Sequence, residues 1–171
     1  VSFKKQQVLY ESELKKNNTD FMDKLDPGTL TMTFLEDLEK YSDLIEAFGM
    51  TACLDKGYRQ LSTGQSRKLL ILSQISKGVS CLVLQSPYDG LDPKSCREMN
   101  KALFHLHQQK KQLIIFVTNT GDIPSWCTHI GVMTKGRLTH QGERQEMLQI
   151  LEQNLHTQSP DFQASVQDLH K

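Results

Sequence analysis

The sequence lacks an excess of charge of either sign. It contains 20 lysine and arginine residues and 20 aspartate and glutamate residues, so its formal net charge at pH 7 is zero. Because no overall field attracts nucleic acid or an anionic membrane surface, any partner must be recognised through a local site. We therefore expect no nucleic-acid partner.

Paired cysteines and long apolar runs are also missing. The four cysteines, at positions 53, 81, 96 and 127, form no CxxC pair and have no histidine at metal-ligand spacing, which argues against a zinc site and against a disulfide scaffold. We expect them to be reduced, mostly buried thiols. No apolar stretch approaches the roughly 20 residues that cross a bilayer. The chain is therefore expected to be cytoplasmic and to reach the inner face of the cell membrane, as a peripheral component, only through a partner.

The apolar pattern divides the chain into three parts. Residues 1–60 are expected to form a helical subdomain, which includes a helix over residues 4–17. From residue 61 to 153, strand-length apolar runs alternate with amphipathic segments, which is typical of a parallel α/β sheet. Residues 154–171 are polar and poor in apolar side chains, and they are expected to form a tail.

A second helix is predicted in the first part. Thr33 and Glu36 have the spacing of a capping box, and Gly49 has the position of a C-terminal cap. Between them, apolar residues recur at helical spacing: Phe34, Leu38, Tyr41, Ile45 and Phe48.

The second part contains two continuous apolar runs, residues 81–84 and 113–117. Such runs predict strands that are buried on both faces. Between them, Asp92 has the position of an N-terminal cap, with Pro93 at the first position of a helix. Residues 130–140 predict a hairpin with glycine in its turn.

The segment Leu61-Ser62-Thr63-Gly64-Gln65 carries the strongest chemical signal. Ser62 and Gln65 again have capping-box spacing, so backbone N–H groups at a helix start would lie beside a serine hydroxyl and a glycine. This arrangement suits a phosphate group. The alternative is that the serine only begins a helix, which is a common role.

Polar residues follow the strand at residues 81–84. Gln85 and Ser86 stand at its carboxyl end, where ligands sit in open α/β sheets. In this order and spacing the sequence resembles the ATP-binding cassette (ABC) ATPases. Residues 61–65 resemble their signature motif, residues 81–86 their Walker B strand, and residues 89–92 their D-loop.

The resemblance continues beyond these motifs. Thr118-Asn119 matches the switch loop of the ABC ATPases, and residues 130–142 resemble their late strands. Within this family, the sequence is most similar to the ModF type of molybdenum-transport ATP-binding proteins, on residues 17–20, 61–64, 67–68, 88–92 and 119–124. The resemblance implies an α/β fold: the C-terminal half of a P-loop NTPase (RecA-like) core with an N-terminal helical subdomain. No residue of the chain is expected to contact molybdate.

The chain departs from the family pattern at its catalytic positions. The family places an aspartate that holds Mg²⁺ and a glutamate that polarises water where this chain has Gln85 and Ser86, and a histidine where it has Asn119. Neither glutamine nor serine carries the required charge near neutral pH. The phosphate-binding loop GxxxxGK[ST] is also absent. We expect a fragment that begins where the first half of a cassette ends, with Gln6 or Gln7 as the Q-loop glutamine or, alternatively, as a surface residue.

The resemblance implies a shared ATP site. Residues Ser62, Thr63, Gly64 and Gln65 would contact ATP bound to a second cassette, and Asp92 would reach across the seam. ATP and Mg²⁺ are expected only in the complete cassette dimer, so the chain alone would be inactive, and no metal site of its own is predicted. A membrane permease is a further expected partner.

Two other hypotheses remain. A regulatory or interaction module derived from a cassette would explain the lost carboxylates. The chromosome-maintenance ATPases share a similar signature, but they place long heptad coiled coils before it, and residues 1–60 contain none.

Overall fold

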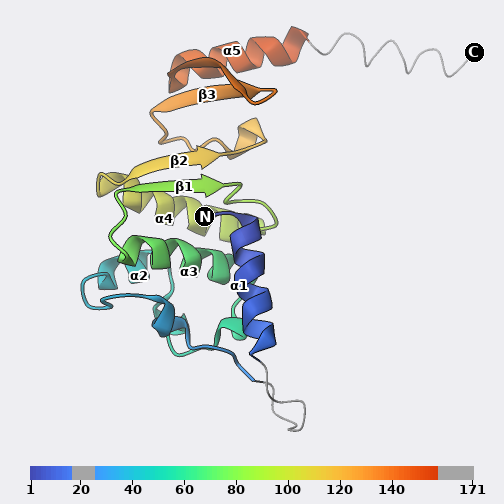
Figure 1. Ribbon diagram of the computed structural model, residues 1–171. Helices are drawn as coiled ribbons and strands as arrows, with labels where there is room; N and C mark the ends of the chain where they lie inside the picture. The colour runs from blue at the N-terminus through green and yellow to red at the C-terminus, as the bar shows by residue number, and fades with distance from the viewer. Residues whose placement is uncertain (17–25, 158–171) are drawn as a thin grey trace, which may run out of the picture. The chain divides into compact units, whose positions relative to one another are not determined.

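The computed structural model describes residues 1–16 and 26–157 (Figure 1). The chain divides into two units, residues 1–123 and 124–171. Across the described residues, no helix has the length and apolar character that spanning a bilayer requires. In the same ranges, no group of three or more His, Cys, Asp and Glu side chains is arranged to hold a metal ion. The resemblance at residues 17–20 lies outside the described part of the chain.

The first unit begins with α1 (Phe3–Lys15), which confirms the predicted helix. The hydroxyl of Ser2 caps it by accepting a hydrogen bond from the N–H of Lys5 at 3.3 Å. Near its other end, the side chain of Glu13 is completely buried. It accepts hydrogen bonds from the segment that follows the undescribed residues, so α1 is tied to the rest of the subdomain.

The predicted helix from residue 33 to 48 is wrong. Its place is taken by a 3₁₀ turn η1 (Thr31–Phe34), an irregular segment, and a short helix α2 (Ser42–Ala47). The hydroxyl of Thr33 donates to the carbonyl oxygen of Leu30 and does not cap a helix. The N–H of Thr31 donates to the carbonyl of Lys56 at 2.8 Å, so contacts with a distant segment fix this backbone.

Part of that pattern does predict the packing. Ile45 and Phe48 are buried, and Gly49 ends the helix with a φ of +64°. Two further 3₁₀ turns, η2 (Thr51–Cys53) and η3 (Tyr58–Gln60), lead to the second part of the unit.

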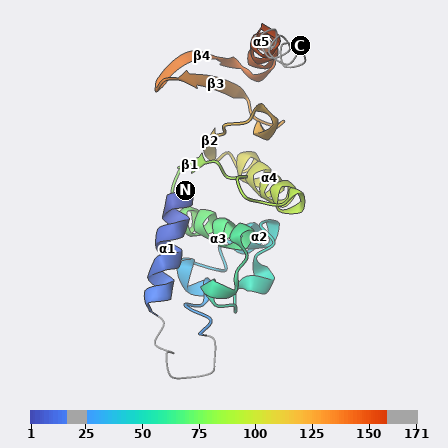
Figure 2. The same ribbon diagram turned by 90° about the vertical axis from the view of Figure 1, so that its right-hand side faces the viewer.

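The central helix of the first unit is α3 (Thr63–Ser76). Its apolar side chains are almost entirely buried: Leu69, Leu70, Ile71, Leu72 and Ile75. It packs against α1 and α4 (Pro93–Gln108), as Figure 2 shows from the side. Most side chains of α3 are buried, whereas Thr63 at its start is exposed.

Two parallel strands complete the first unit. β1 (Cys81–Gln85) pairs with β2 (Gln112–Phe116), with Gln85 opposite Phe116, and α4 is the crossover between them. The prediction of burial on both faces is wrong. Residues of β1 alternate between buried and exposed, because α3 and α4 lie on one side of the two strands (Figure 1). On the other face, Val83 and Ile114 are 46% and 49% exposed.

The second unit confirms the predicted hairpin. β3 (His129–Thr134) and β4 (Arg137–Glu143) are antiparallel. Lys135 and Gly136 form the turn, both with positive φ, at 50° and 76°. Helix α5 (Arg144–Thr157) follows and packs on the hairpin.

The four cysteines are free thiols, as expected. Their predicted burial holds only for Cys53. Cys81 is exposed because it lies on the uncovered side of β1, and Cys96 and Cys127 are half-buried.

Candidate functional site

The predicted capping box at the start of α3 is confirmed. The Ser62 hydroxyl accepts from the N–H of Gln65 at 3.2 Å, and the Gln65 side-chain oxygen accepts from the N–H of Ser62 at 2.9 Å. Ser62 and Thr63 are exposed. No hydrogen bond within residues 1–16 and 26–157 uses the N–H groups of Thr63 or Gly64. The helix start therefore has an exposed serine hydroxyl and two backbone donors without an acceptor in the described residues, of which the one on Gly64 belongs to a buried residue.

Gly64 lies where α3 meets the start of α4. A Cβ atom on Gly64 would lie 3.5 Å from Leu91 Cδ2 and 3.6 Å from the Ser95 side chain. Any side chain at this position would therefore face the start of α4. The signature segment therefore lies beside the residues that resemble the D-loop.

Asp92 caps α4, as the sequence predicts. Its Oδ1 accepts from the N–H groups of Lys94 and Ser95 at 2.9 and 3.0 Å, and its Oδ2 accepts from the Ser95 hydroxyl at 2.6 Å. These hydrogen bonds, that of the Ser95 hydroxyl first, lower the pKa of Asp92. The carboxylate is exposed and stays ionised at neutral pH.

Gln85, Ser86 and Asn119 stand at the carboxyl edge of the two strands. The N–H of Ser86 donates to the carbonyl of Phe116 at 2.8 Å, so the end of β1 is fixed beside the end of β2. Asn119 follows three residues after Phe116, and its side-chain oxygen accepts from the N–H of Gly121 at 3.0 Å. The backbone of Ser86 has a φ of +46°.

These three residues do not fit a magnesium ion. Mg²⁺ is held in nucleotide sites through one or two carboxylates, and the side chains at these positions are two amides and a hydroxyl. The Asn119 oxygen is already used within its own turn.

Arg67, on α3, connects the signature segment to the loop that follows β1. Its side chain is buried, and its Nη1 donates to the carbonyl oxygens of Asp89 at 2.7 Å, Pro87 at 3.0 Å and Ser86 at 3.5 Å. Burial lowers the pKa of the guanidinium, which nevertheless remains charged. Sequence reasoning named Arg67 only within the resemblance to the ModF type and assigned it no role. Its position three residues after Gly64, on the buried side of α3, was the available signal.

Gln6 is part of the same cluster. Its side-chain nitrogen donates to the Ser66 hydroxyl at 2.6 Å and to the Thr63 carbonyl at 3.0 Å, and its oxygen accepts from Arg67 Nε at 3.2 Å. Gln6 is buried, so its interpretation as a surface glutamine is wrong. Gln7 is exposed and donates a hydrogen bond to Glu11 on α1, so its interpretation as a surface glutamine is correct.

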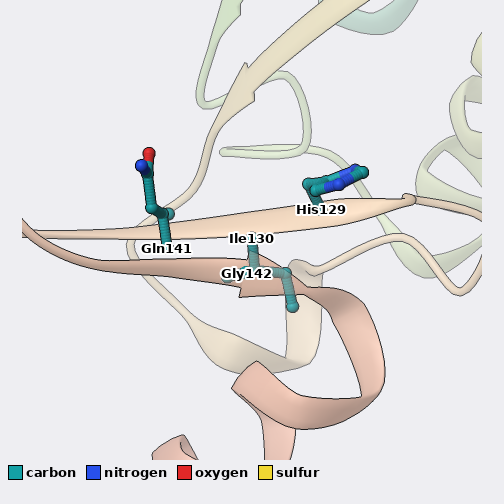
Figure 3. Close-up of a pocket in the computed structure, with 5 residues that line it drawn as sticks. His129, Ile130, Gln141 and Gly142 are labelled. Atoms are coloured by element: carbon teal, nitrogen blue, oxygen red, sulfur yellow. The ribbon is translucent and has the colours of Figure 1, made fainter.

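A hollow of about 430 Å³ lies on the hairpin of the second unit, lined by His129, Ile130, Gly131, Gln141 and Gly142. The side chains of His129 and Gln141 extend from the same face of the hairpin (Figure 3). None of the site residues predicted from the sequence lines this hollow.

Comparison with known proteins gives the same family for sequence and structure. No family model matches the sequence. The chain is 32% identical over 155 residues to the ABC transporter ATP-binding protein ModF of Escherichia coli, which covers 87% of the chain and 32% of ModF. It is 34% identical over 102 residues to the energy-coupling factor transporter ATP-binding protein EcfA2 of Enterococcus faecalis, which covers 56% of the chain and 35% of that protein. The chain spans about a third of the length of these curated relatives.

Solved structures share the fold. CbiO1 from Clostridium perfringens, described as part of the ABC transporter complex cbiONQ, aligns with a TM-score of 0.59 at 23% identity, over 75% of this chain and 53% of that one. A nucleotide-free ATP-binding cassette from an ABC transporter aligns with a TM-score of 0.61 at 17% identity, over 84% and 52%. The chain is thus similar in sequence to ABC transporter ATP-binding proteins and shares the fold of ATP-binding cassettes, and its segments that resemble the signature, Walker B and D-loop motifs follow in the order of that family.

Proposed function

We propose that the chain is part of the ATP-binding subunit of an ABC transporter. In this proposal it contributes its signature segment, residues 61–65, to an ATP site whose phosphate loop belongs to a second cassette. The observation that supports the proposal is the start of α3, where Ser62 and Thr63 are exposed and where no hydrogen bond within the described residues uses the N–H groups of Thr63 and Gly64.

A nucleotide phosphate fits these donors. Phosphate oxygens accept hydrogen bonds from backbone N–H groups and from hydroxyls, and the start of a 14-residue helix favours negative charge. Gln65 holds Ser62 in place through the capping box. ATP supplies the phosphate whose transfer to water drives transport in this family, and the residues of this chain bind and orient it.

The chain's own Walker B position takes no part in hydrolysis in this proposal. Gln85, Ser86 and Asn119 supply neither a carboxylate for Mg²⁺ nor a general base. ATP and Mg²⁺ are bound at the competent site of the complete dimer, and the isolated chain is inactive.

The partners follow from the relatives. CbiO1 is described as part of the complex cbiONQ, and ModF and EcfA2 are named as transporter ATP-binding proteins. We infer a second cassette and a membrane permease as partners, with the chain at the cytoplasmic face. Transport of molybdenum rests on the similarity to ModF alone.

Two substitutions in the native assembly test the shared site. Ser62→Arg places a large cation where the phosphate would bind through the serine, so it should abolish ATP hydrolysis. Gln85→Ala should change the rate less than twofold, because that position is not used. Equal effects of the two changes would contradict a site that is competent on one side only.

A regulatory module is the second candidate function, favoured by the amide and hydroxyl at positions 85 and 86. In that case an assembly without this chain would hydrolyse ATP at an unchanged rate. A rate that falls to background without the chain would support the shared ATP site.

A further inference from the structure

We propose that Arg67 is a positioning residue that holds the signature segment and the loop from Ser86 to Asp89 in one fixed arrangement. This inference rests on the proposed function, because it explains how two separate segments of the chain hold Ser62, which would contact the nucleotide, and Asp92, which would reach across the dimer seam, at a fixed separation.

The first observation is the set of acceptors that surround the guanidinium. Arg67 Nη1 donates to three carbonyl oxygens of one loop, at Ser86, Pro87 and Asp89. The shortest of these distances is 2.7 Å, to Asp89. Because three carbonyl oxygens of the loop converge on one nitrogen of α3, movement of the loop relative to this helix would break these hydrogen bonds.

A different nitrogen of the Arg67 side chain is connected to the start of α3. Arg67 Nε donates to Gln6 Oε1 at 3.2 Å, and Gln6 in turn donates to the Thr63 carbonyl at 3.0 Å. Thr63 is the first residue of α3. The guanidinium is thus connected to the loop on one side and, through Gln6, to the first turn of α3 on the other.

The charge of Arg67 makes this arrangement specific. Its side chain is only 4% exposed, and none of the ion pairs found in the described ranges includes it. A buried charge is tolerated only when its hydrogen bonds are satisfied. The planar guanidinium supplies donors in two directions at once, whereas a lysine ammonium is a point charge on a flexible stem.

The residues that Arg67 holds are close along the chain to Ser62 and Asp92. Ser62 lies one residue before Thr63, and Asp92 lies three residues after Asp89. Gly64 lies beside Leu91, because a Cβ atom added to Gly64 would be 3.5 Å from Leu91 Cδ2. Movement of the loop would therefore change the separation of Ser62 and Asp92 without removing either group.

The test is steady-state ATP hydrolysis by the native assembly with Arg67→Lys. We expect kcat to fall at least tenfold while KM for ATP changes less than twofold, because the binding groups remain and only their relative position is lost. Arg67→Gln, which buries no charge and retains one amide donor, should also lower kcat and keeps the test valid if the lysine variant does not fold.

Lys68 provides the matched control. It is a buried basic residue on the same helix, but its Nζ pairs with Glu98 Oε2 on α4 at 2.9 Å, and no hydrogen bond between described residues joins its side chain to the loop. Lys68→Met should lower the Tm and leave kcat within twofold of the wild type.

The outcomes separate this inference from the proposed function. If Ser62→Arg abolishes hydrolysis while both Arg67 variants keep the wild-type kcat and only lower the Tm, Arg67 is merely structural and this inference fails alone. An equal fall in kcat for Lys68→Met and Arg67→Lys would overturn it as well. If Ser62→Arg has no effect, the proposed function fails, and the inference fails with it.

Discussion

The carboxylate of Glu13 accepts hydrogen bonds from both the backbone N–H and the hydroxyl of Thr29, at 2.8 and 2.9 Å. Lys16 adds a third, to Oε1, at 2.6 Å. Burial by itself would raise the pKa of Glu13, but the hydrogen bonds from Lys16 and Thr29 outweigh it, and the pKa is lowered. The ionised carboxylate therefore joins α1 to the segment that leads toward η1.

Glu13→Gln should destabilise the chain at neutral pH by about 2 kcal/mol, the typical cost of leaving buried donors poorly paired. Folding lowers the pKa of Glu13, so its ionised form stabilises the folded chain. This stabilisation is complete above the pKa that Glu13 has in the unfolded chain. It is lost as the pH falls through the lower pKa that Glu13 has in the folded chain. Urea unfolding should show a lower free energy of unfolding for the variant than for the wild type at pH 7, and this difference should disappear in acid. A gap that is independent of pH would contradict this account.

Features that depend on neighbouring residues were predictable from the sequence. The caps Ser62 and Asp92 lie next to the helices that they begin, and both form the predicted hydrogen bonds. The hairpin also depends on its own turn residues. In each case local chemistry and the final fold favour the same structure.

Features that depend on distant segments were not predictable. The region after Leu30 has a helical apolar pattern, yet an isolated bridge between Leu30 and Gly57 and a hydrogen bond from Thr31 to Lys56 hold it in another conformation. The exposed face of β1 could not be anticipated either, because an apolar run does not show how many helices will cover it.

The same distinction applies to the site. The acceptors of Arg67 Nη1 lie 19, 20 and 22 residues away along the chain, so no local spacing indicates them. The phosphate-facing role of residues 62–65 stays a prediction, as does the part of Asp92 at a dimer seam.

Gly64→Ala should keep both the fold and ATP hydrolysis. The added methyl group would meet Leu91 and Ser95 at 3.5 and 3.6 Å, which is ordinary van der Waals contact, and alanine favours a helix over glycine by up to about 1 kcal/mol. The N–H of residue 64 remains available. We expect an equal or higher Tm and a rate within twofold of the wild type. Abolished hydrolysis in a stable variant would mean that the phosphate approaches the Cα of Gly64 directly.

Gly64→Leu is the paired change. A large side chain has no room between α3 and α4, so the variant should lose about 2 kcal/mol or more of stability. Denaturant unfolding of both variants measures the difference, and similar stability of the alanine and leucine variants would show that the start of α4 can move away.

Glu36→Ala should change the free energy of unfolding by less than about 0.5 kcal/mol, which is typical of an exposed residue without a structural role. The reason is that Thr33 donates to Leu30 and no capping box forms. A true capping residue would cost about 1 kcal/mol. A loss of that size on thermal or urea unfolding would indicate that the helix from residue 33 forms in solution.

Ser86→Gly should stabilise the chain. Ser86 has a φ of +46°, a conformation that costs a residue with a side chain about 1–2 kcal/mol, while the added freedom of glycine in the unfolded chain costs about 0.5–1 kcal/mol. The net gain should be about 0.5–1 kcal/mol, measured by urea unfolding. Because the N–H of residue 86 still donates to Phe116 and position 86 carries no catalytic group in the proposed function, the rate of ATP hydrolysis by the assembly should not change. A more stable variant with lost activity would show that the Ser86 hydroxyl acts at the site, and the proposal of an unused Walker B position would then be wrong.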